Sequence, residues 1–283
     1  MKCVLITGVN SYVGNSFVEW VQQYPQKIQV DKISLRDDSW KDMDFSTYDS
    51  ILHVAGIAHR KETKKNKLLY YKVNRDLTEQ IAYKAKSEGV KQFIFLSSMS
   101  VYGMTTGIIN ENTIPSPNSW YGDSKLQAEE KINKLKSEVF KVAILRPPMI
   151  YGKGCPGNYQ LLRKVALISP VFPKIRNRRS MIHMDNLSIY MNNLINSCHQ
   201  GLYFPQNKLY VNTSNLVKEI ANANGKDTKL VKNLESSIRY MELNVVRKVF
   251  GSLIYDTALN ENDKIQEDLF DFKESIIFTE ENK

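Results

Sequence analysis

A tyrosine and a lysine with three residues between them are the first candidates for chemistry in this sequence. Tyr121 and Lys125 belong to the segment YGDSK, for which the pattern predicts a helix over 121–136, so both side chains share one helical face. A tyrosine with a pKa near ~10 is a poor base at neutral pH. A nearby ammonium group favours the tyrosinate and lowers that pKa. The spacing therefore favours a tyrosine that is activated for proton transfer.

A pair of glycines near the N-terminus is the second candidate. Gly8 and Gly14 lie in the segment TGVNSYVG, between a predicted strand at 2–7 and a predicted helix at 13–24. Glycine lets the backbone turn tightly and approach a pyrophosphate, and the start of the helix offers free N–H groups at the positive end of its dipole. The position of the pair between a strand and a helix predicts a dinucleotide phosphate loop rather than a purely structural turn.

The elements around these residues alternate between strand and helix. Short apolar runs predict further strands, the pattern predicts a long helix closed by Gly89, and a weak strand is expected near Trp40. This alternation predicts an α/β fold with a doubly wound, parallel, Rossmann-type sheet and a ligand site at the carboxyl ends of its strands. We expect a dinucleotide-binding domain over 1–152 and a small α/β substrate lobe over 153–283, with some elements returning to the first domain. The further strands are expected at 29–35, 50–54, 92–96 and 141–145, and the long helix at 68–88.

Composition narrows the class of protein. The chain has 283 residues, 42% of them hydrophobic, and a net charge of +9. No apolar run reaches the ~18 residues of a membrane span, and the first residues enter a strand pattern at once, so neither membrane insertion nor a signal peptide is expected. Three separated cysteines, Cys3, Cys155 and Cys198, have no metal-binding spacing and favour a reducing cytoplasm. The basic run at 60–67 has no interleaved aromatic residues, so we expect a solvated loop and no nucleic-acid partner.

These motifs together resemble the extended short-chain dehydrogenase/reductases, the NAD-dependent epimerase/dehydratase family. The family's TGxxGxxG loop matches 7–14 except that Ser11 replaces the middle glycine, and FLSSMSVYG at 95–103 is similar to its SSxxVYG segment. The resemblance implies that Tyr121 moves the proton on a sugar oxygen and that Ser98 orients and polarises the carbonyl. It also implies that Lys125 lowers the pKa of the tyrosine and binds the nicotinamide ribose, while the cofactor exchanges hydride with the carbon.

The choice of nicotinamide depends on the end of the second predicted strand. Arg36 there suits the 2′-phosphate of NADP(H), which we favour; if Asp37 instead holds the ribose 2′-hydroxyl, the cofactor is NAD(H). The resemblance places Asp44 and Phe45 at the adenine edge. The complete set of expected cofactor-binding residues is Gly8, Asn10, Ser11, Tyr12, Val13, Gly14, Arg36, Asp44, Phe45, Val54, Ala55, Gly56, Asn74, Tyr121, Lys125 and Pro148.

Two further segments resemble those that bind a nucleotide-linked sugar. RPPMIYG at 146–152 is similar to the family's RPxxxYG, and RRSMIHMD at 178–185 to its RDxIHVxD. The resemblance implies that Arg179 clamps a phosphate and that Asn158 reaches the diphosphate. A UDP-sugar is the expected substrate, and His53 and His183 are expected to be packed rather than catalytic. The expected substrate-binding residues are Ser98, Ser100, Tyr121, Asn158, Arg179 and, more weakly, Arg247.

Three reactions are known on this scaffold. A 4,6-dehydratase needs an Asp-Glu pair after the catalytic hydroxyl, and Met99 and Ser100 stand there instead. A 4-ketoreductase consumes an exchangeable cofactor, often NADPH, so Arg36 favours it. Closer resemblance to capsule-type reductases also favours reduction of a UDP-4-keto-6-deoxy-N-acetylhexosamine for surface polysaccharide biosynthesis. A UDP-sugar 4-epimerase is the alternative, and a non-catalytic dinucleotide sensor a remote one. The resemblance also suggests a homodimer through the helices at 68–88 and 121–136.

Overall fold

The computed structural model describes residues 1–23, 28–58, 60–232, 250–260, 265 and 269–281. The chain divides into two compact units, and each contains segments that are separate in the sequence. The division expected at residue 152 stays a prediction about where cofactor and substrate bind. The first unit comprises Met1–Gly103, Ile114–Pro147 and Ser188–Pro205, and the second comprises Met104–Thr113, Pro148–Leu187 and Gln206–Lys283.

A parallel sheet forms the centre of the first unit. Its strands follow the order β10-β6-β4-β3-β1-β2, and every neighbouring pair is parallel. Such sheets are covered on both faces, which explains why the inner strands β1, β3, β4 and β6 are largely buried. The doubly wound α/β fold predicted from the sequence is confirmed. The strands are β1 (Lys2–Thr7), β2 (Ile28–Ile33), β3 (Ser50–His53), β4 (Gln92–Leu96), β6 (Lys141–Leu145) and β10 (Gly201–Tyr203).

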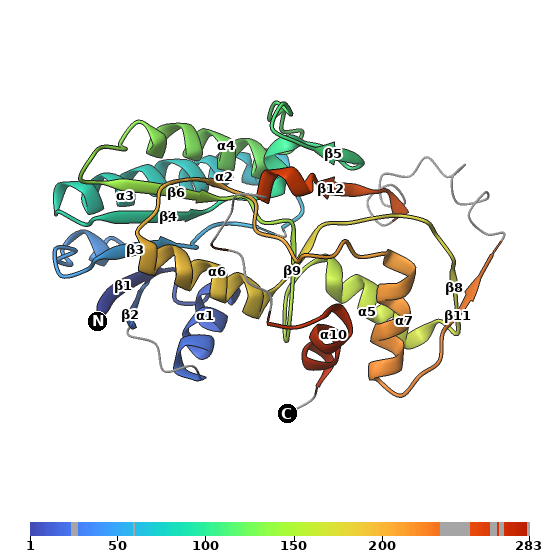
Figure 1. Ribbon diagram of the computed structural model, residues 1–283. Helices are drawn as coiled ribbons and strands as arrows, with labels where there is room; N and C mark the ends of the chain where they lie inside the picture. The colour runs from blue at the N-terminus through green and yellow to red at the C-terminus, as the bar shows by residue number, and fades with distance from the viewer. Residues whose placement is uncertain (24–27, 59, 233–249, 261–264, 266–268, 282–283) are drawn as a thin grey trace. The chain divides into compact units, whose positions relative to one another are not determined.

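Helices cover both faces of this sheet, as Figure 1 shows. α1 (Tyr12–Gln23) and α6 (Met184–Ser197) lie on one face, and α2 (Lys67–Tyr71), α3 (Leu77–Ser87) and α4 (Trp120–Asn133) on the other. The helix expected over 68–88 is interrupted by a π-helical turn at Lys72–Asp76 between α2 and α3. Such turns occur frequently at functional sites.

The core beneath α3 and α4 consists of tightly packed aromatic and aliphatic side chains. Phe93 and Phe95 are fully buried there, and burial of a side chain of this size contributes ~1.5–3 kcal/mol. Trp40 joins the same cluster with 4% exposure. The weak strand expected near Trp40 was wrong: Ser39–Lys41 is a 3-10 turn, held by the Asp37 carboxylate, which accepts a hydrogen bond from the Ser39 N–H. The indole is buried by this turn, so no strand is needed to bury it.

The order of the strands reverses between β1 and β3, because the chain passes from edge strand β2 back across β1. Ligands of doubly wound sheets bind where the order reverses, at the carboxyl ends of the strands. Thr7 and His53 end the two strands, and Thr7 Oγ1 lies 2.8 Å from His53 Nδ1. The loops that follow these two residues are therefore the expected place for a ligand.

The second unit is an α/β arrangement of short elements. Three two-stranded parallel sheets pair β7 with β9, β8 with β11 and β5 with β12. α7 packs against both α5 and α10, and buried Glu280 of α10 accepts hydrogen bonds from Tyr159 (2.8 Å) and Arg163 (2.6 Å) of α5. The elements are β5 (Gly107–Ile109), β7 (Met149–Tyr151), α5 (Asn158–Ile168), β8 (Val171–Pro173), β9 (Met181–His183), α7 (Thr213–Ala223), β11 (Lys229–Val231), β12 (Leu253–Tyr255) and α10 (Phe272–Glu280).

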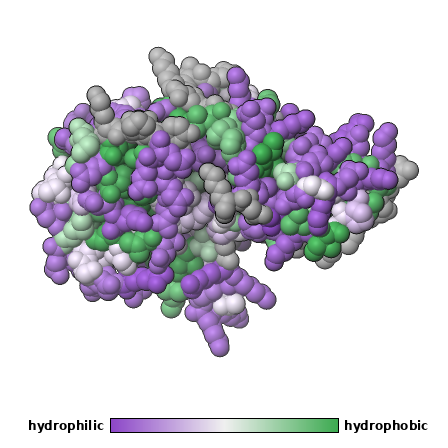
Figure 2. Space-filling model, turned by 90° about the horizontal axis from the view of Figure 1, so that it is seen from below, coloured by the Kyte–Doolittle hydropathy of each residue, from purple (hydrophilic) through white to green (hydrophobic). Residues whose placement is uncertain are grey.

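The surface is mixed in character. Figure 2 shows a face on which hydrophilic residues predominate and hydrophobic ones form smaller patches. None of the helices in the described part of the chain combines the length and the apolar character that crossing a bilayer requires. The described residues also contain no group of three or more His, Cys, Asp or Glu side chains arranged to hold a metal ion.

Candidate active site

The loop after β1 forms a tight turn beside the loop after β3. Gly8 has φ +94°, and a Cβ atom at this residue would lie 3.2 Å from the Cα of Ala55, so both the turn and the close approach require glycine. Ser11 has no such requirement, since Cys198 is the only non-glycine residue with positive φ in the described chain. The Ser11 hydroxyl accepts a hydrogen bond from the Gly14 N–H at 3.3 Å. Serine therefore fits this loop in place of the family's glycine.

The remaining loop residues differ in exposure. Asn10 is exposed and Tyr12 half-buried at the start of α1, whereas Val13 is buried. Gly14 is also buried, and a Cβ atom there would lie 3.2 Å from a Val54 methyl group. The glycine turn therefore leads directly into the first turn of α1, which is the arrangement that a pyrophosphate site uses.

The residues expected around the adenosine lie after β2 and before β3. Arg36 and Asp44 are exposed, and Asp44 accepts a hydrogen bond from the Ser46 N–H at 2.8 Å, which lowers its pKa. Phe45 is fully buried in the core, and its N–H donates to Glu88 at 2.6 Å. Within the Asp44-Phe45 pair, the structure therefore presents the aspartate to solvent.

The catalytic candidates Tyr121 and Lys125 lie one turn apart on α4. Lys125 is 4% exposed, and its ammonium donates to the Leu96 carbonyl at 2.8 Å and lies 4.6 Å from the centre of the Phe95 ring. A Cβ atom at Gly56 would lie 3.3 Å from Lys125 Nζ. The predicted cofactor loop and the predicted catalytic lysine are therefore direct neighbours.

The serine segment after β4 reaches Tyr121. The Ser98 side chain interacts with the Tyr121 side chain and lowers its pKa, and the hydroxyl oxygens of Ser98 and Ser100 lie 3.1 Å apart. A Cβ atom at Gly122 would lie 2.5 Å from the Ser100 carbonyl oxygen, so only glycine lets α4 approach this closely. The residue between the tyrosine and the aspartate of the motif thus has a steric role.

Burial controls the pKa values of the pair. It raises the pKa of Tyr121, against the hydrogen bond from Ser98, which lowers it. It lowers the pKa of Lys125 to about 8, against the charge of Glu129, which raises it. The sequence predicted a lowered tyrosine pKa, and in the protein alone the direction is the opposite, because desolvation of the phenolate outweighs the other contributions.

Asn74 is fully buried in the π-helical turn rather than on a helix surface. Its Oδ1 accepts from the Ile57 N–H at 2.7 Å, and its Nδ2 donates to the Ile57 carbonyl at 3.1 Å and to Ser124 Oγ at 3.0 Å. It therefore connects the loop after β3 to α4, beside Gly56. Ser124, inside the catalytic motif, is a functional neighbour that the sequence analysis did not identify.

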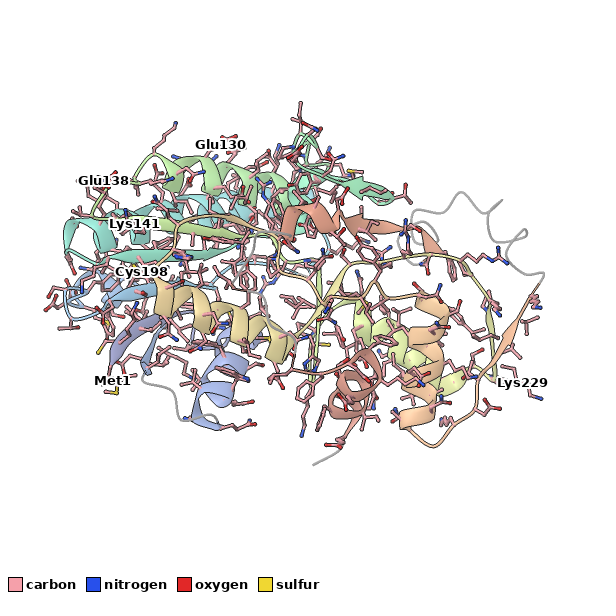
Figure 3. The ribbon with its side chains drawn as sticks, in the orientation of Figure 1. Met1, Glu130, Glu138, Lys141, Cys198 and Lys229 are labelled. Carbon is pink, nitrogen blue, oxygen red and sulfur yellow. The ribbon has the colours of Figure 1, made fainter. Side chains whose placement is uncertain are left out.

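A buried ion pair fixes three motifs to one another. Arg146 Nε donates to the two carboxylate oxygens of Glu129 at 3.1 and 3.2 Å, and Nη2 donates to the same carboxylate. The Ser97 hydroxyl also donates to Glu129, and Arg146 Nη1 donates to Tyr102 Oη at 2.8 Å. Glu129 is buried, whereas its neighbour Glu130 lies on the outer side of α4 (Figure 3). Sequence analysis missed Glu129, although its spacing of four from Lys125 places it on the same helical face.

Two of the expected substrate residues that the structure describes, Asn158 and Arg179, belong to the second unit. Arg179 pairs through its backbone with Val211, and its Nη1 donates to the Gly251 carbonyl at 2.9 Å. Burial lowers the pKa of Arg179. Asn158 is exposed at the start of α5, Pro148 is buried before β7, and Arg247 lies outside the described residues.

Both histidines near the expected sites are packed, as the sequence analysis expected. His53 is buried between two threonine hydroxyls, with Thr78 Oγ1 2.9 Å from its Nε2, and burial lowers its pKa to about 3. His183 is 3% exposed against the rings of Tyr151 and Phe270, and burial lowers its pKa to about 4. Both rings are therefore neutral near pH 7.

Comparison with known proteins identifies the family. The model of the NAD dependent epimerase/dehydratase family matches residues 4–188. This chain belongs to that family. It is therefore an NAD(P)-dependent enzyme of the nucleotide-sugar epimerase and reductase group, and the suspected resemblance is confirmed.

Several relatives in this family are 4-epimerases. The chain is 30% identical to N-acetyl-alpha-D-glucosaminyl-diphospho-ditrans,octacis-undecaprenol 4-epimerase of Escherichia coli O157:H7, over 77% of this chain and 71% of the relative. It is also 30% identical to UDP-glucose 4-epimerase of Vibrio cholerae, over 80% and 77%.

Solved structures share the fold at low identity. UDP-glucuronic acid 4-epimerase from Bacillus cereus, in complex with NAD, has a TM-score of 0.77 at 16% identity and covers 98% of this chain and 97% of its own. RMD from Pseudomonas aeruginosa, complexed with NADPH, has a TM-score of 0.75 at 17% identity, with 99% and 98% covered. The fold is therefore shared by proteins that bind either nicotinamide.

Proposed function

We propose that this protein changes the C4 centre of a hexose that is linked to a diphosphate, with a UDP-sugar as the substrate. The observation that supports this most strongly is the cluster at the carboxyl ends of the strands. Ser98 lies close enough to Tyr121 to lower its pKa, and a Cβ atom at Gly56 would lie 3.1 Å from Asn74 Oδ1 and 3.3 Å from Lys125 Nζ. The tight turn at Gly8 and the exposed backbone of Gly56 beside Lys125 fit the pyrophosphate and ribose of NAD(P).

The chain's own groups then have defined tasks. Ser98 holds the sugar oxygen by a hydrogen bond, and Tyr121 gives or takes the proton at that oxygen. Lys125, whose pKa is about 8, is mostly protonated at neutral pH and stabilises negative charge on the phenol oxygen. NAD(P), when bound, supplies or accepts the hydride. Arg179 binds the substrate diphosphate through its planar guanidinium.

Among the reactions of the family, 4-epimerisation now has the stronger support. The two relatives described above are 4-epimerases, and the same serine, tyrosine and lysine serve both the oxidation and the reduction in such a cycle. The relative from Escherichia coli acts on a sugar linked through diphosphate to a polyprenol, so an N-acetylhexosamine is the sugar we propose to test first.

Reduction of a UDP-4-keto-6-deoxy-N-acetylhexosamine in surface polysaccharide biosynthesis is the second candidate. It is favoured by exposed Arg36 near the end of β2, because a guanidinium there suits the 2′-phosphate of NADP(H). A reductase needs this exchangeable cofactor, whereas an epimerase retains NAD(H) through many cycles. The two candidates therefore differ first in the cofactor that they hold.

The deciding test begins with the freshly purified protein. It is denatured, and any released nucleotide is identified by mass spectrometry. Stoichiometric NAD supports the epimerase, which is then assayed with UDP-N-acetylglucosamine, UDP-glucose and N-acetylglucosaminyl-diphospho-undecaprenol. Release of no nucleotide, with NADPH consumption on a UDP-4-keto-6-deoxy sugar, supports the reductase. Absence of turnover in both assays, with binding of NAD or NADPH intact, would favour the dinucleotide sensor.

A variant isolates the contribution of Arg36. Arg36→Ala is expected to weaken NADPH binding about tenfold and to leave NADH binding unchanged, because the guanidinium contacts only the 2′-phosphate. The matched control is Lys41→Ala, which removes another exposed cation that is paired with Asp38. Equal affinity of wild type and Arg36→Ala for NADPH would remove the support for NADP(H).

The assembly proposed from the resemblance is a homodimer. The exposed side chains of Leu68 in α2 and Tyr83 in α3, at 80% and 65% exposure, belong to one of the two helices that the resemblance assigns to the interface. Sedimentation velocity at micromolar concentration distinguishes the dimer from the monomer.

A further inference from the structure

The first turn of the catalytic helix is held by a carboxylate from a distant part of the chain. Glu62 Oε1 accepts a hydrogen bond from the Tyr121 N–H at 2.9 Å, and Glu62 Oε2 accepts one from the Trp120 N–H at 3.1 Å. Both oxygens of one side chain therefore bind the backbone of two consecutive residues. One of these residues is the proposed proton donor and acceptor.

This contact completes the hydrogen bonding of the helix start. The first four N–H groups of a helix have no partner within the helix. In α4, the Ser119 hydroxyl accepts from the Gly122 N–H at 3.1 Å, and the Ser119 carbonyl accepts from the Asp123 N–H at 2.9 Å. Only Trp120 and Tyr121 depend on a partner outside the helix. A negative charge at this end is also favourable to the helix dipole.

Glu62 differs from its neighbours in charge and in exposure. It is the one acidic residue in the basic run at 60–67, and it is half-buried while the flanking Lys61 and Thr63 are exposed. The run was expected to be a solvated loop; its lysines are exposed, but Lys64–Asn66 forms a 3-10 turn and Lys67 begins α2. Its glutamate instead faces α4, and no sequence pattern signals this.

The loop after β3 is thereby fastened to the active site at two points. Asn74 binds the backbone of Ile57 and the side chain of Ser124 in α4. Glu62, five residues after Ile57 in the same loop, binds the first residues of α4. Gly56, next to Ile57, is the neighbour of Lys125. The two contacts therefore link the proposed cofactor loop to Lys125 at one end and to the backbone of Tyr121 at the other.

We propose that Glu62 is a positioning residue of this enzyme: its carboxylate fixes the backbone at Tyr121 and thereby sets the place of the catalytic hydroxyl. The inference rests on the proposed role of Tyr121 in proton transfer. A displacement of about 1 Å from the reactive geometry can cost about a hundredfold in rate, so a contact to the backbone of the catalytic residue can have a large effect on turnover.

The first test does not depend on the substrate. Amide hydrogen exchange is measured for peptides that include Trp120 and Tyr121 in wild type, Glu62→Ala and Glu62→Gln. We expect exchange at these two amides to be at least tenfold faster in Glu62→Ala and intermediate in Glu62→Gln, which keeps one acceptor oxygen. The matched control is Glu79→Ala, which removes another acid that contacts α4, through Lys131 at 2.5 Å. Unchanged protection of the two amides in both Glu62 variants would overturn the contact itself.

The second test separates positioning from stability. In the assay to which the wild type responds, Glu62→Ala is expected to lower kcat at least tenfold while KM and the cofactor Kd change by less than threefold. In a Tyr121→Phe background, the same change is expected to have no further effect, because Glu62 acts through the missing hydroxyl. Glu79→Ala is expected to stay within twofold of wild type.

The outcomes separate this inference from the proposed function. If Glu62→Ala does not fold, Glu62→Gln replaces it, with an expected threefold to tenfold loss of kcat. A kcat within twofold of wild type, or an equal loss in the Tyr121→Phe background, would overturn the positioning role. If the wild type shows no turnover, the proposed function fails, while hydrogen exchange still decides whether Glu62 holds the start of α4.

Discussion

Arg146 in the first unit is buried and Arg179 in the second is half-buried, and the two arginines differ in their partners. Arg146 in the first unit is paired with buried Glu129; Ser97 donates a hydrogen bond to Glu129, and Tyr102 accepts one from Arg146. Arg179 in the second unit binds a backbone carbonyl, and within the described residues it makes no ion pair. A buried charge without a counter-ion is costly unless a ligand supplies one. We therefore propose that Arg146 supports the structure, whereas Arg179 binds an anion such as a diphosphate.

The same difference holds for the sites around them. In the first unit, Ser98, Tyr121, Lys125 and Asn74 are already hydrogen-bonded to one another or to nearby backbone. The proposed catalytic residues are thus held in place by contacts within the protein. We expect changes in the first unit to affect kcat and stability, and changes at Arg179 to affect KM.

The largest expected effect is that of Tyr121→Phe. Loss of the hydroxyl removes the proton donor and acceptor, so kcat is expected to fall by about 10²- to 10⁴-fold with KM nearly unchanged. The control is Tyr83→Phe on the exposed surface of α3, which removes a tyrosine hydroxyl that has no role in the proposed chemistry. A Tyr121→Phe variant with wild-type kcat would contradict the acid–base role. Steady-state kinetics on both variants provide the measurement.

Arg146→Met should produce the largest loss of stability. It leaves Glu129 charged, 3% exposed and without its guanidinium partner, which typically costs about 3–5 kcal/mol. Urea denaturation measures the free energy of unfolding of the variant and of the double variant Arg146→Met/Glu129→Leu. Recovery in the double variant is expected, because it removes both charges together. If Arg146→Met is as stable as the wild type, Arg146 has no structural role that distinguishes it from Arg179.

The pH dependence of stability tests the buried ammonium. Burial lowers the pKa of Lys125 to about 8, below its ordinary value of ~10.4. Between these pH values the unfolded chain binds a proton that the folded protein has released, so stability should rise with pH in this window. Relative to Lys125→Met, the wild type should gain on the order of 3 kcal/mol from pH 8 to 10.5. A difference between the two proteins that does not change with pH would show that Lys125 is not desolvated.

Arg179→Met tests whether the arginine of the second unit binds substrate rather than supporting the structure. Loss of the guanidinium should raise KM for the UDP-sugar about 10- to 100-fold, with kcat and stability nearly unchanged, because the charge–phosphate bond contributes about 1.5–3 kcal/mol. The matched control is Arg178→Met, an exposed neighbour that lies 5.5 Å from the Tyr210 ring. If stability falls as much as in Arg146→Met while KM is constant, Arg179 is structural too.

The smallest expected effect compares two glycines. Gly8→Ala and Gly89→Ala both place a side chain at positive φ, +94° and +82°, which costs about 1–2 kcal/mol. Only Gly8 lies against another loop, at 3.2 Å from Ala55, while nothing lies within 4 Å of a Cβ atom at Gly89. Gly8→Ala should therefore also weaken cofactor binding, about tenfold by isothermal titration. An equal cofactor Kd in both variants would argue against the loop as the phosphate site.

Much of the first unit could be predicted because its signals are local. The strand at 2–7, the turn at Gly8 and the helix over 120–133 each follow from short patterns of apolar residues, glycine and helix spacing. The π-helical turn around Asn74 and the 3-10 turn at Trp40 could not be predicted in this way. Both depend on what the side chain meets in the folded core, and propensity is a weak guide where tertiary contacts decide.

The sequence by itself determined the parallel α/β fold, the glycine turn after β1 and the pairing of Tyr121 with Lys125 on one helix, since all three depend on residues near one another in the chain. Only the tertiary structure decided that Glu129 binds Arg146, that Asn74 is buried beside Gly56, and that Glu62 holds the backbone of Tyr121. It also decided the direction of the pKa shifts, with that of Tyr121 raised and that of Lys125 lowered. The physical reason is that burial and long-range hydrogen bonds exist only once distant segments have packed together.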